Sequence, residues 1–168
     1  MRHYLCAVIV VLVFGTPAFS QTLPPLAHRA DLSGPRFGVT LLPERFVAEL
    51  GRRHIDVGAG VSQFGWQFER QFYRKDSSIS MLTEWIALAG GLEQGLLLPS
   101  VSWMVGLRTK DGVEFGIGPN VSPAGTALVL ATGMTFRAGI LNVPLNVAVI
   151  PSRTGTRFTV LSGFSVRD

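Results

Sequence analysis

Few side chains in this sequence have the type and spacing for chemistry, and the most suggestive pair is His54 and Asp56. An imidazole two residues from a carboxylate can ligate a metal ion, or can act as a general base that the carboxylate orients. Either role needs further converging groups, and this loop lacks further ligands. We therefore predict that His54 and Asp56 are solvated loop residues, with no metal site and no catalytic residue.

The sequence contains only incomplete matches to cofactor-binding motifs. The stretches Gly58 to Gly60 and Gly116 to Gly118 begin like a dinucleotide fingerprint, but Gln63 and Val121 stand where its third glycine belongs, and neither opens an expected helix. The sequence holds no P-loop and no nucleophile elbow. We predict no cofactor.

The first 20 residues have the anatomy of a secretory signal peptide. Arg2 precedes an apolar run from Tyr4 to Phe14, and Ala18 and Ser20 place small residues at the positions that signal peptidase reads. The run of about 11 apolar residues is far shorter than the roughly 20 of a spanning helix. We predict cleavage before Gln21 and export of the chain.

Removal of residues 1–20 leaves 148 residues (168 minus 20), which is enough for one domain. We predict a flexible segment over 21–35 and a single β-barrel domain over 36–168. Cys6 is the single cysteine and leaves with the signal, so the mature chain has no disulfide. Arg2 leaves too, and the remaining 14 basic and 11 acidic residues give +3. Such mild, scattered charge predicts no nucleic-acid partner.

The strand signal is clearest on both sides of the turn sequence Lys110-Asp111-Gly112, where large apolar residues alternate with small or polar ones. The turn sets a register that places Leu107 beside Phe115 on one face and Arg108 beside Glu114 on the other. The two alternations agree on one hairpin. We predict that Arg108 and Glu114 form an interior ion pair that fixes this register.

The same alternation continues over most of the chain, with expected strands that include Phe37 to Leu42, Val61 to Arg74 and Ser77 to Ala89. One insertion departs from it: Glu44 to Arg53 has helical spacing, with Gly51 where a helix would stop. We predict an all-β protein, an antiparallel meander β-barrel of about eight strands with one short helix in the first connection.

The two faces of the expected strands differ in composition. One face is large and apolar, whereas the other is made mostly of small, uncharged residues, which is a poor surface for water. A small membrane barrel carries its large residues outward toward lipid. Residues predicted to face lipid or ligand are Phe64, Trp66, Phe68, Phe72, Trp103, Phe115, Phe136, Phe158 and Phe164. Two alternatives bury the same face, in a soluble lipocalin-like barrel that binds a hydrophobic ligand or in a secreted β-sandwich.

Over Phe37 to Arg167, the meander, the strand lengths and the inverted faces resemble the small eight-stranded bacterial outer-membrane β-barrel proteins. The resemblance implies short periplasmic turns, longer external loops and membrane lipid as the main partner. It departs at the C-terminus, where the last aromatic residue, Phe164, comes four residues before the end.

Some barrels of that group modify the acyl chains of lipid A with His, Ser and Asp near the external rim. By resemblance alone, that activity would involve His54, Asp56 and Ser62. Our first expectation is a non-enzymatic outer-membrane barrel with a structural or interaction role. A soluble periplasmic or secreted barrel is the alternative, the acyl-modifying enzyme is the third hypothesis, and a protein or hydrophobic small-molecule partner stays open.

Overall fold

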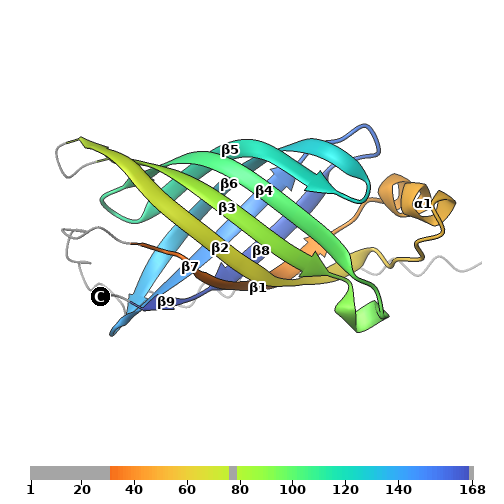
Figure 1. Cartoon of the computed structure of the whole chain (residues 1–168), viewed down its shortest axis with the longest axis horizontal. Coiled ribbons are helices and arrows are strands. Elements are labelled where there is room, and N and C mark those ends of the chain that lie inside the picture. The colour runs from red at the N-terminus through yellow and green to blue at the C-terminus, as the bar shows by residue number, and fades with distance from the viewer. Residues whose placement is uncertain (1–30, 76–78, 167–168) are drawn as a thin grey trace, which may run out of the picture.

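The computed structural model describes residues 31–75 and 79–166, in which eight strands close into an antiparallel barrel in meander order (Figure 1). This confirms the predicted fold class. The strands are β1 Gly34–Leu41, β2 Gly60–Lys75, β3 Ile79–Gly90, β4 Leu98–Thr109, β5 Val113–Ser122, β6 Gly125–Ala138, β7 Leu141–Ile150, β8 Arg157–Gly163 and β9 Ser165–Val166. β8 and β9 are two pieces of the last barrel strand, interrupted at Phe164.

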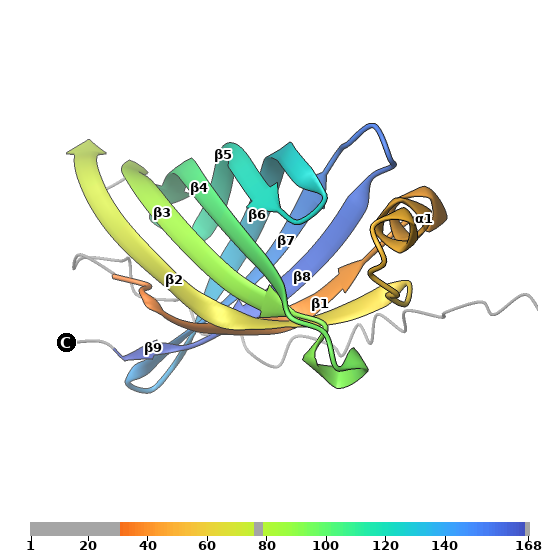
Figure 2. The same cartoon turned by 45° about the vertical axis from the view of Figure 1, so that its right-hand side comes forward.

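The barrel has two unlike ends (Figures 1 and 2). The helix end carries α1 Glu44–Arg52, the short 3₁₀ helix η1 Leu92–Gln94, the β5–β6 turn and the β7–β8 loop. At the turn end β1 begins, β9 ends, and tight turns join β4 to β5 and β6 to β7. β1 pairs with both β2 and β8, and β6 pairs with both β5 and β7, so the ring closes without an open sheet edge.

The predicted central hairpin has the expected register. Leu107 pairs with Phe115 and Arg108 with Glu114, and Gly112 takes the left-handed conformation that the turn needs, with φ +82°. The alternation therefore specified this pairing correctly. Strand ends are less accurate, because β1 begins at Gly34 instead of Phe37.

The domain prediction covers several residues that the structure does not describe. The signal over 1–20 lies outside the described residues, as does most of the segment 21–35. Of its last residues, Leu32 is buried, and Gly34 and Pro35 pair with β2.

Helix α1 lies across the helix end of the barrel. Its Phe46 and Leu50 pack with Val57 and Val61, so the apolar face of the helix points inward. The helix ends at Arg52, one residue before the predicted Arg53, and Gly51, the expected stop signal, lies inside it.

His54 follows the last turn of α1, and its left-handed backbone (φ 62°) allows two carbonyls at the helix end to accept hydrogen bonds. The His54 N–H donates to the Gly51 oxygen and the Ile55 N–H to the Leu50 oxygen, both at 3.0 Å. This is a Schellman motif, in which a left-handed residue follows the last helical turn.

One irregularity in β2 changes which side chains face outward. The pairing with β3 shifts between Gln71 and Tyr73, so Phe72 is the extra residue of a β-bulge. Strict alternation would send Tyr73 inward, but after the bulge both Phe72 and Tyr73 are exposed.

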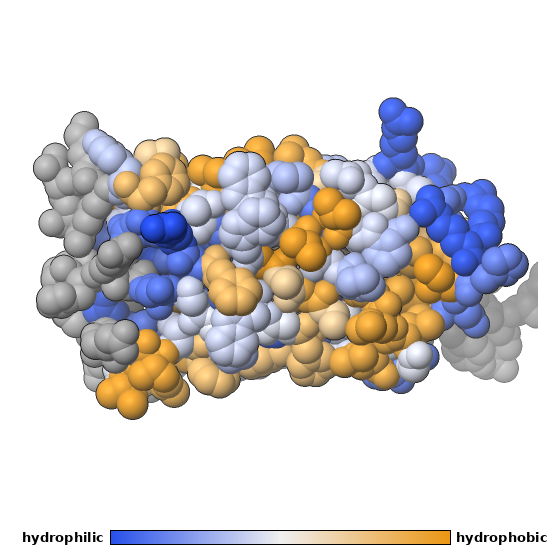
Figure 3. All heavy atoms as spheres, in the orientation of Figure 1, coloured by the Kyte–Doolittle hydropathy of each residue, from blue (hydrophilic) through white to orange (hydrophobic). Residues whose placement is uncertain are grey.

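Every strand contributes large apolar side chains to the outside of the barrel, which we call the outer wall. Its described members are Phe37, Val39, Leu41, Phe64, Trp66, Phe68, Phe72, Tyr73, Ile79, Trp85, Val101, Trp103, Leu107, Phe115, Ile117, Val121, Leu128, Leu130, Met134, Phe136, Leu145, Val147, Phe158, Val160, Phe164 and Val166. Among the strand residues whose side chains are described, Arg70 is the one charged residue at an exposed position. Figure 3 shows apolar residues along the barrel and the strongest concentration of hydrophilic residues beside α1.

Candidate binding cavity

The interior of the barrel is polar and charged toward the turn end. We call this group the polar cluster; it comprises Arg36, Gln67, Glu69, Glu84, Arg108 and Glu114. These side chains come from strands β1 to β5 and project inward because they alternate with the residues of the outer wall. An eight-stranded barrel has an interior that side chains fill, and here polar groups fill this part of it.

Arg108 is the centre of the larger hydrogen-bonded group in the polar cluster. Its Nε donates to Glu114 Oε1 at 2.7 Å, as the sequence register predicted for this pair. Its terminal nitrogens also donate to both carboxylate oxygens of Glu69, with the NH1 to Oε1 distance at 2.6 Å. Sequence analysis missed Glu69 because it lies two strands away from Arg108, and no hairpin register brings the two together.

A second series of hydrogen bonds in the polar cluster involves Arg36, Gln67 and Glu84. Arg36 Nε donates to Gln67 Oε1 at 2.9 Å, and Gln67 Nε2 donates to Glu84 Oε1 at 2.7 Å. Arg36 also donates to the backbone oxygens of Leu32 and Pro35. Every guanidinium nitrogen of Arg36 therefore has a partner, as buried charges require.

On the helix-end side of the polar cluster the barrel encloses a cavity of about 90 Å³. Its apolar lining is centred on Ile86, Met104, Val129 and Ile150, which form one buried group. Glu84 lines the cavity and also belongs to the polar cluster, so the cluster forms the floor.

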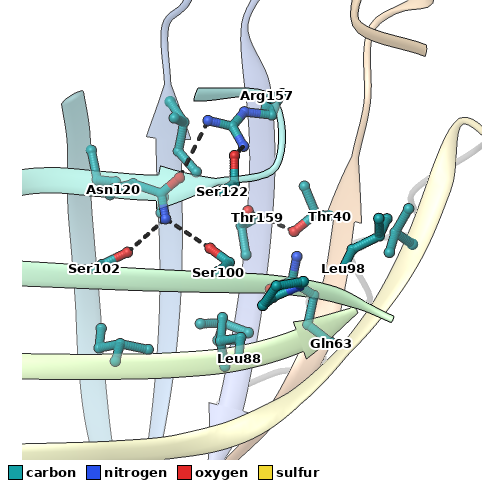
Figure 4. A pocket seen from close by; sticks show the side chains of 18 of the residues that line it. Thr40, Gln63, Leu88, Leu98, Ser100, Ser102, Asn120, Ser122, Arg157 and Thr159 are labelled. Atoms are coloured by element: carbon teal, nitrogen blue, oxygen red, sulfur yellow. Dashed lines mark hydrogen bonds between the residues drawn. The ribbon is translucent and has the colours of Figure 1, made fainter. Parts of the chain in front are cut away.

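Polar side chains surround the outer part of the cavity (Figure 4). Asn120 Nδ2 donates to Ser100 Oγ at 2.7 Å and to Ser102 Oγ at 3.0 Å, which joins β5 to β4. Thr40 and Thr159 share a hydrogen bond of 2.8 Å between their hydroxyls, which joins β1 to β8. These short bonds order the wall of the cavity without any charged group.

Helix α1 covers the mouth of the cavity, which Phe46 and Leu50 help to line. Arg53, just after the helix, donates from NH1 to the Pro123 oxygen at 2.9 Å. Pro123 lies in the β5–β6 turn, halfway round the ring from β1, so the α1 segment reaches across the opening.

Arg157, the first residue of β8, also lines the cavity, and with Glu84 it is one of two charged residues among the described lining. Only 6 % of its surface is exposed, and its guanidinium carbon lies 4.7 Å from the centroid of the Phe46 ring. Alternation with Phe158 places Arg157 on the inner face of the last strand, but it gives no sign of the cavity beside it.

The structure gives His54, Asp56 and Ser62 separate surroundings. His54 is exposed just after the last turn of α1, and Asp56 is exposed in the loop that follows. Within residues 31–75 and 79–166, no hydrogen bond joins any two of the three, and no group of three or more His, Cys, Asp or Glu side chains could hold a metal ion.

Ser62 instead binds Glu93 of η1. The Ser62 N–H donates to Glu93 Oε1 at 3.0 Å, and the Ser62 hydroxyl donates to Oε2. These hydrogen bonds lower the pKa of Glu93 to about 2, and the bond from the Ser62 hydroxyl has the largest effect. They fasten η1 to the start of β2 at the helix end.

All nine aromatic residues predicted to meet lipid or ligand lie in the outer wall, with 42 to 57 % of their surfaces exposed. Trp103 adjoins Trp85 of the neighbouring strand, with ring centroids 6.2 Å apart, and its Nε1 donates to Thr83 Oγ1 at 2.9 Å. None of the nine lines the cavity.

The fold and these surfaces define a closed eight-stranded antiparallel β-barrel with an apolar exterior and an interior that is polar toward the turn end and partly apolar around the cavity. No family model, no curated protein and no solved structure matches this chain. Within the described residues, no helix has the length and apolar character needed to cross a membrane.

Proposed function

We propose that this protein is exported and resides in an outer membrane as an integral β-barrel, with a structural or interaction role and no catalytic one. The observation that carries the proposal is the outer wall, because all eight barrel strands direct large apolar residues outward. In water such a surface would expose a contiguous apolar area far beyond that of a soluble monomer. Lipid is the medium that favours it.

The distribution of charge supports the same placement. The exposed charged residues of α1 and its flanks, among them Arg45, Arg52 and Arg53, lie beyond the strands at the helix end. On the barrel itself, Arg70 is the one described strand residue with an exposed charge. Most strands are also close to or longer than the roughly 9 to 11 residues that a tilted strand needs to cross a bilayer.

The proposed orientation puts the turn end in the periplasm and the helix end outside. Outer-membrane barrels have short periplasmic turns, and the tight β4–β5 and β6–β7 turns lie at the turn end. The larger helix end, with α1 and η1, is then the surface available to partners.

The soluble lipocalin-like barrel remains the second hypothesis, but the interior favours it less. That hypothesis places the aromatic face inside, around a hydrophobic ligand, whereas the described interior holds the polar cluster and a small cavity. The outward position of Phe64, which is 52 % exposed, therefore favours the membrane proposal.

The deciding experiment is export of the full chain in a Gram-negative host, followed by urea and alkaline carbonate washing of the membranes. We expect the protein to stay in the outer-membrane pellet and to migrate faster on gels before boiling than after. A soluble monomer in the periplasm or the medium would refute the proposal. A change in lipid A mass that His54→Ala abolishes would instead support the acyl-modifying enzyme.

A further inference from the structure

Arg157 is a buried cation whose hydrogen-bonding capacity is poorly used. Its NH2 lies 3.4 Å from Asn120 Oδ1 and its NH1 lies 3.5 Å from Ser122 Oγ, both at the long limit of a hydrogen bond. Its Nε, buried like the rest, has no partner among the described residues. Nor does any described carboxylate form an ion pair with it.

The other two buried arginines of the barrel differ in this respect. Arg108 binds the carboxylates of both Glu69 and Glu114, and Arg36 makes hydrogen bonds of 2.5 to 3.0 Å with three oxygens. A buried charge is costly unless it is paired and hydrogen-bonded. Arg157 alone of the three lines the cavity, so a partner for it can come from a bound molecule.

The geometry around Arg157 specifies what that partner looks like. The guanidinium carbon of Arg157 lies over the Phe46 ring, 4.7 Å from its centroid. The Nε–H has no partner among the described residues, so it is left to bind an anion. Arginine N–H groups match a planar carboxylate in two-pronged fashion. Of the anions that arginine binds in this way, a carboxylate is the planar one, and it can carry a hydrocarbon part into the cavity.

The rest of the cavity favours a ligand whose remaining part is a hydrocarbon. Beyond Arg157, the lining is aliphatic at Ile86, Met104, Val129 and Ile150. One water molecule needs roughly 10 to 15 Å³ of such a cavity, so about 90 Å³ has room for several water molecules. The site suits a small molecule.

We propose that the cavity beneath α1 binds a short-chain aliphatic carboxylate, with its carboxylate on Arg157 and its hydrocarbon part among Ile86, Met104, Val129 and Ile150. The hydroxyl of Ser122, now at long range from Arg157, can donate to the same carboxylate. The proposal concerns the interior alone and does not depend on what covers the outer wall.

The chain offers its own reporter for this site. Met104 lines the cavity and is 1 % exposed, whereas Met134 lies in the outer wall and is 42 % exposed. Labelling the methionine methyl groups with ¹³C in the folded full chain therefore gives one probe inside the cavity and an outside control. The titrants are butanoate and its neutral isostere butanamide.

We expect butanoate to shift the Met104 methyl signal saturably, with one ligand per chain, and to leave Met134 unchanged. Butanamide should shift it at least tenfold more weakly. Arg157→Gln should weaken butanoate binding at least tenfold, and Arg157→Lys, which keeps the charge, should weaken it less.

A second variant tests the same cavity without changing Arg157, in case the Arg157 substitutions disturb the fold. Ala148→Leu fills the cavity from β7 while leaving Arg157 in place, and it should also abolish the Met104 shift. Folding of each variant is checked by its circular dichroism spectrum, which reports the β-barrel in lipid and in water alike. The proposal is overturned if folded wild type shows no saturable Met104 shift, or if butanamide or Arg157→Gln behaves like butanoate with wild type.

Discussion

Glu69 and Arg108 bind each other inside the barrel through both carboxylate oxygens, although β2 and β4, which carry them, are separated by β3. Both side chains are almost completely buried. The same guanidinium holds Glu114 of β5, so one side chain links three strands that share a curved wall. We expect this contact to be a major determinant of stability, because breaking a buried ion pair leaves an unpaired charge.

Replacing Arg108 tests that expectation. Arg108→Leu removes the cation and leaves two buried carboxylates unpaired, so it should lower the free energy of unfolding by about 3 to 5 kcal/mol. Glu69→Gln keeps Arg108 paired with Glu114, and we expect a smaller loss of about 1 to 3 kcal/mol. Urea titration of the folded protein in lipid vesicles measures both.

The control for this comparison is Arg52→Ala, which removes an exposed ion pair with Glu49 on α1. Such pairs contribute about 0 to 1 kcal/mol, so this variant should be near neutral. Equal effects of Arg108→Leu and Arg52→Ala would contradict the role assigned to the buried group.

The medium outside the barrel can be tested by adding a charge to the outer wall. Ile117→Arg places a cation in the middle of β5, on the outside. In lipid this should cost about 2 to 4 kcal/mol. In water an exposed substitution of this kind should stay within about 0.5 kcal/mol of neutral.

Val121→Arg is the matched control, because Val121 lies on the same face of the same strand near the helix end. Close to a membrane surface the cost falls to about 0 to 1 kcal/mol. Similar small effects at both positions, measured by the same urea titration, would argue for a soluble barrel.

Glycine at position 65 is required by the close approach of two backbones. A Cβ there would lie 1.9 Å from the carbonyl oxygen of Ala87 on β3, a distance that real contacts do not reach. We expect Gly65→Ala to lower the folded yield sharply, as judged by gel migration before boiling. Gly60→Ala in the same strand, with nothing within 4 Å, should fold like the wild type.

The contact between Ser62 and Glu93 should depend on pH. Hydrogen bonds from Ser62 lower the pKa of Glu93 from 4.5 to about 2 in the folded protein. A carboxylate whose pKa falls on folding stabilises the fold above its unfolded pKa and loses that effect as pH falls through the folded value. The contact should therefore hold above about pH 4.5 and be lost as the pH drops toward 2.

Hydrogen exchange at the Ser62 amide measures this loss directly. We expect protection to fall between pH 4.5 and 2 beyond what intrinsic exchange rates explain. In Glu93→Gln the protection should be independent of pH over that range. An unchanged pH dependence in this variant would show that Glu93 is not the group that titrates.

His54 offers a test of a structural against a catalytic role. Its left-handed backbone, with φ 62°, favours glycine and disfavours a β-branched residue. His54→Gly should leave the free energy of unfolding unchanged or slightly higher, and His54→Val should lower it by about 1 to 2 kcal/mol. Loss of a measurable activity in His54→Gly without loss of stability would refute a purely structural role.

Period-two alternation was enough to predict the barrel and its central hairpin, because each strand has one large face and one small face. It failed where a residue's position depends on three-dimensional closure. Glu69 finds Arg108 only once β2, β3 and β4 curve around a common interior. Tyr73 turns outward only because Phe72 forms a bulge, and no turn residue in the sequence marks that bulge.

The cavity could not be predicted from the sequence for the same reason. Arg157 is visible in the sequence as one inward-facing polar residue among several, and the alternation does not show which groups surround it. Its isolation from carboxylates becomes apparent only when β5, β8 and α1 are placed together. The helix was predicted over Glu44 to Arg53 and lies at Glu44–Arg52. Gly51 was the expected stop signal because glycine is the usual left-handed residue, and His54 takes that conformation instead.

Glu84 and the rest of the polar cluster form the floor of the cavity. The barrel interior therefore has no continuous passage from the helix end to the turn end. A solute admitted beneath α1 would meet hydrogen-bonded side chains in place of a passage and would have to leave by the same route. The protein should accordingly be electrically silent when it is inserted into a planar bilayer.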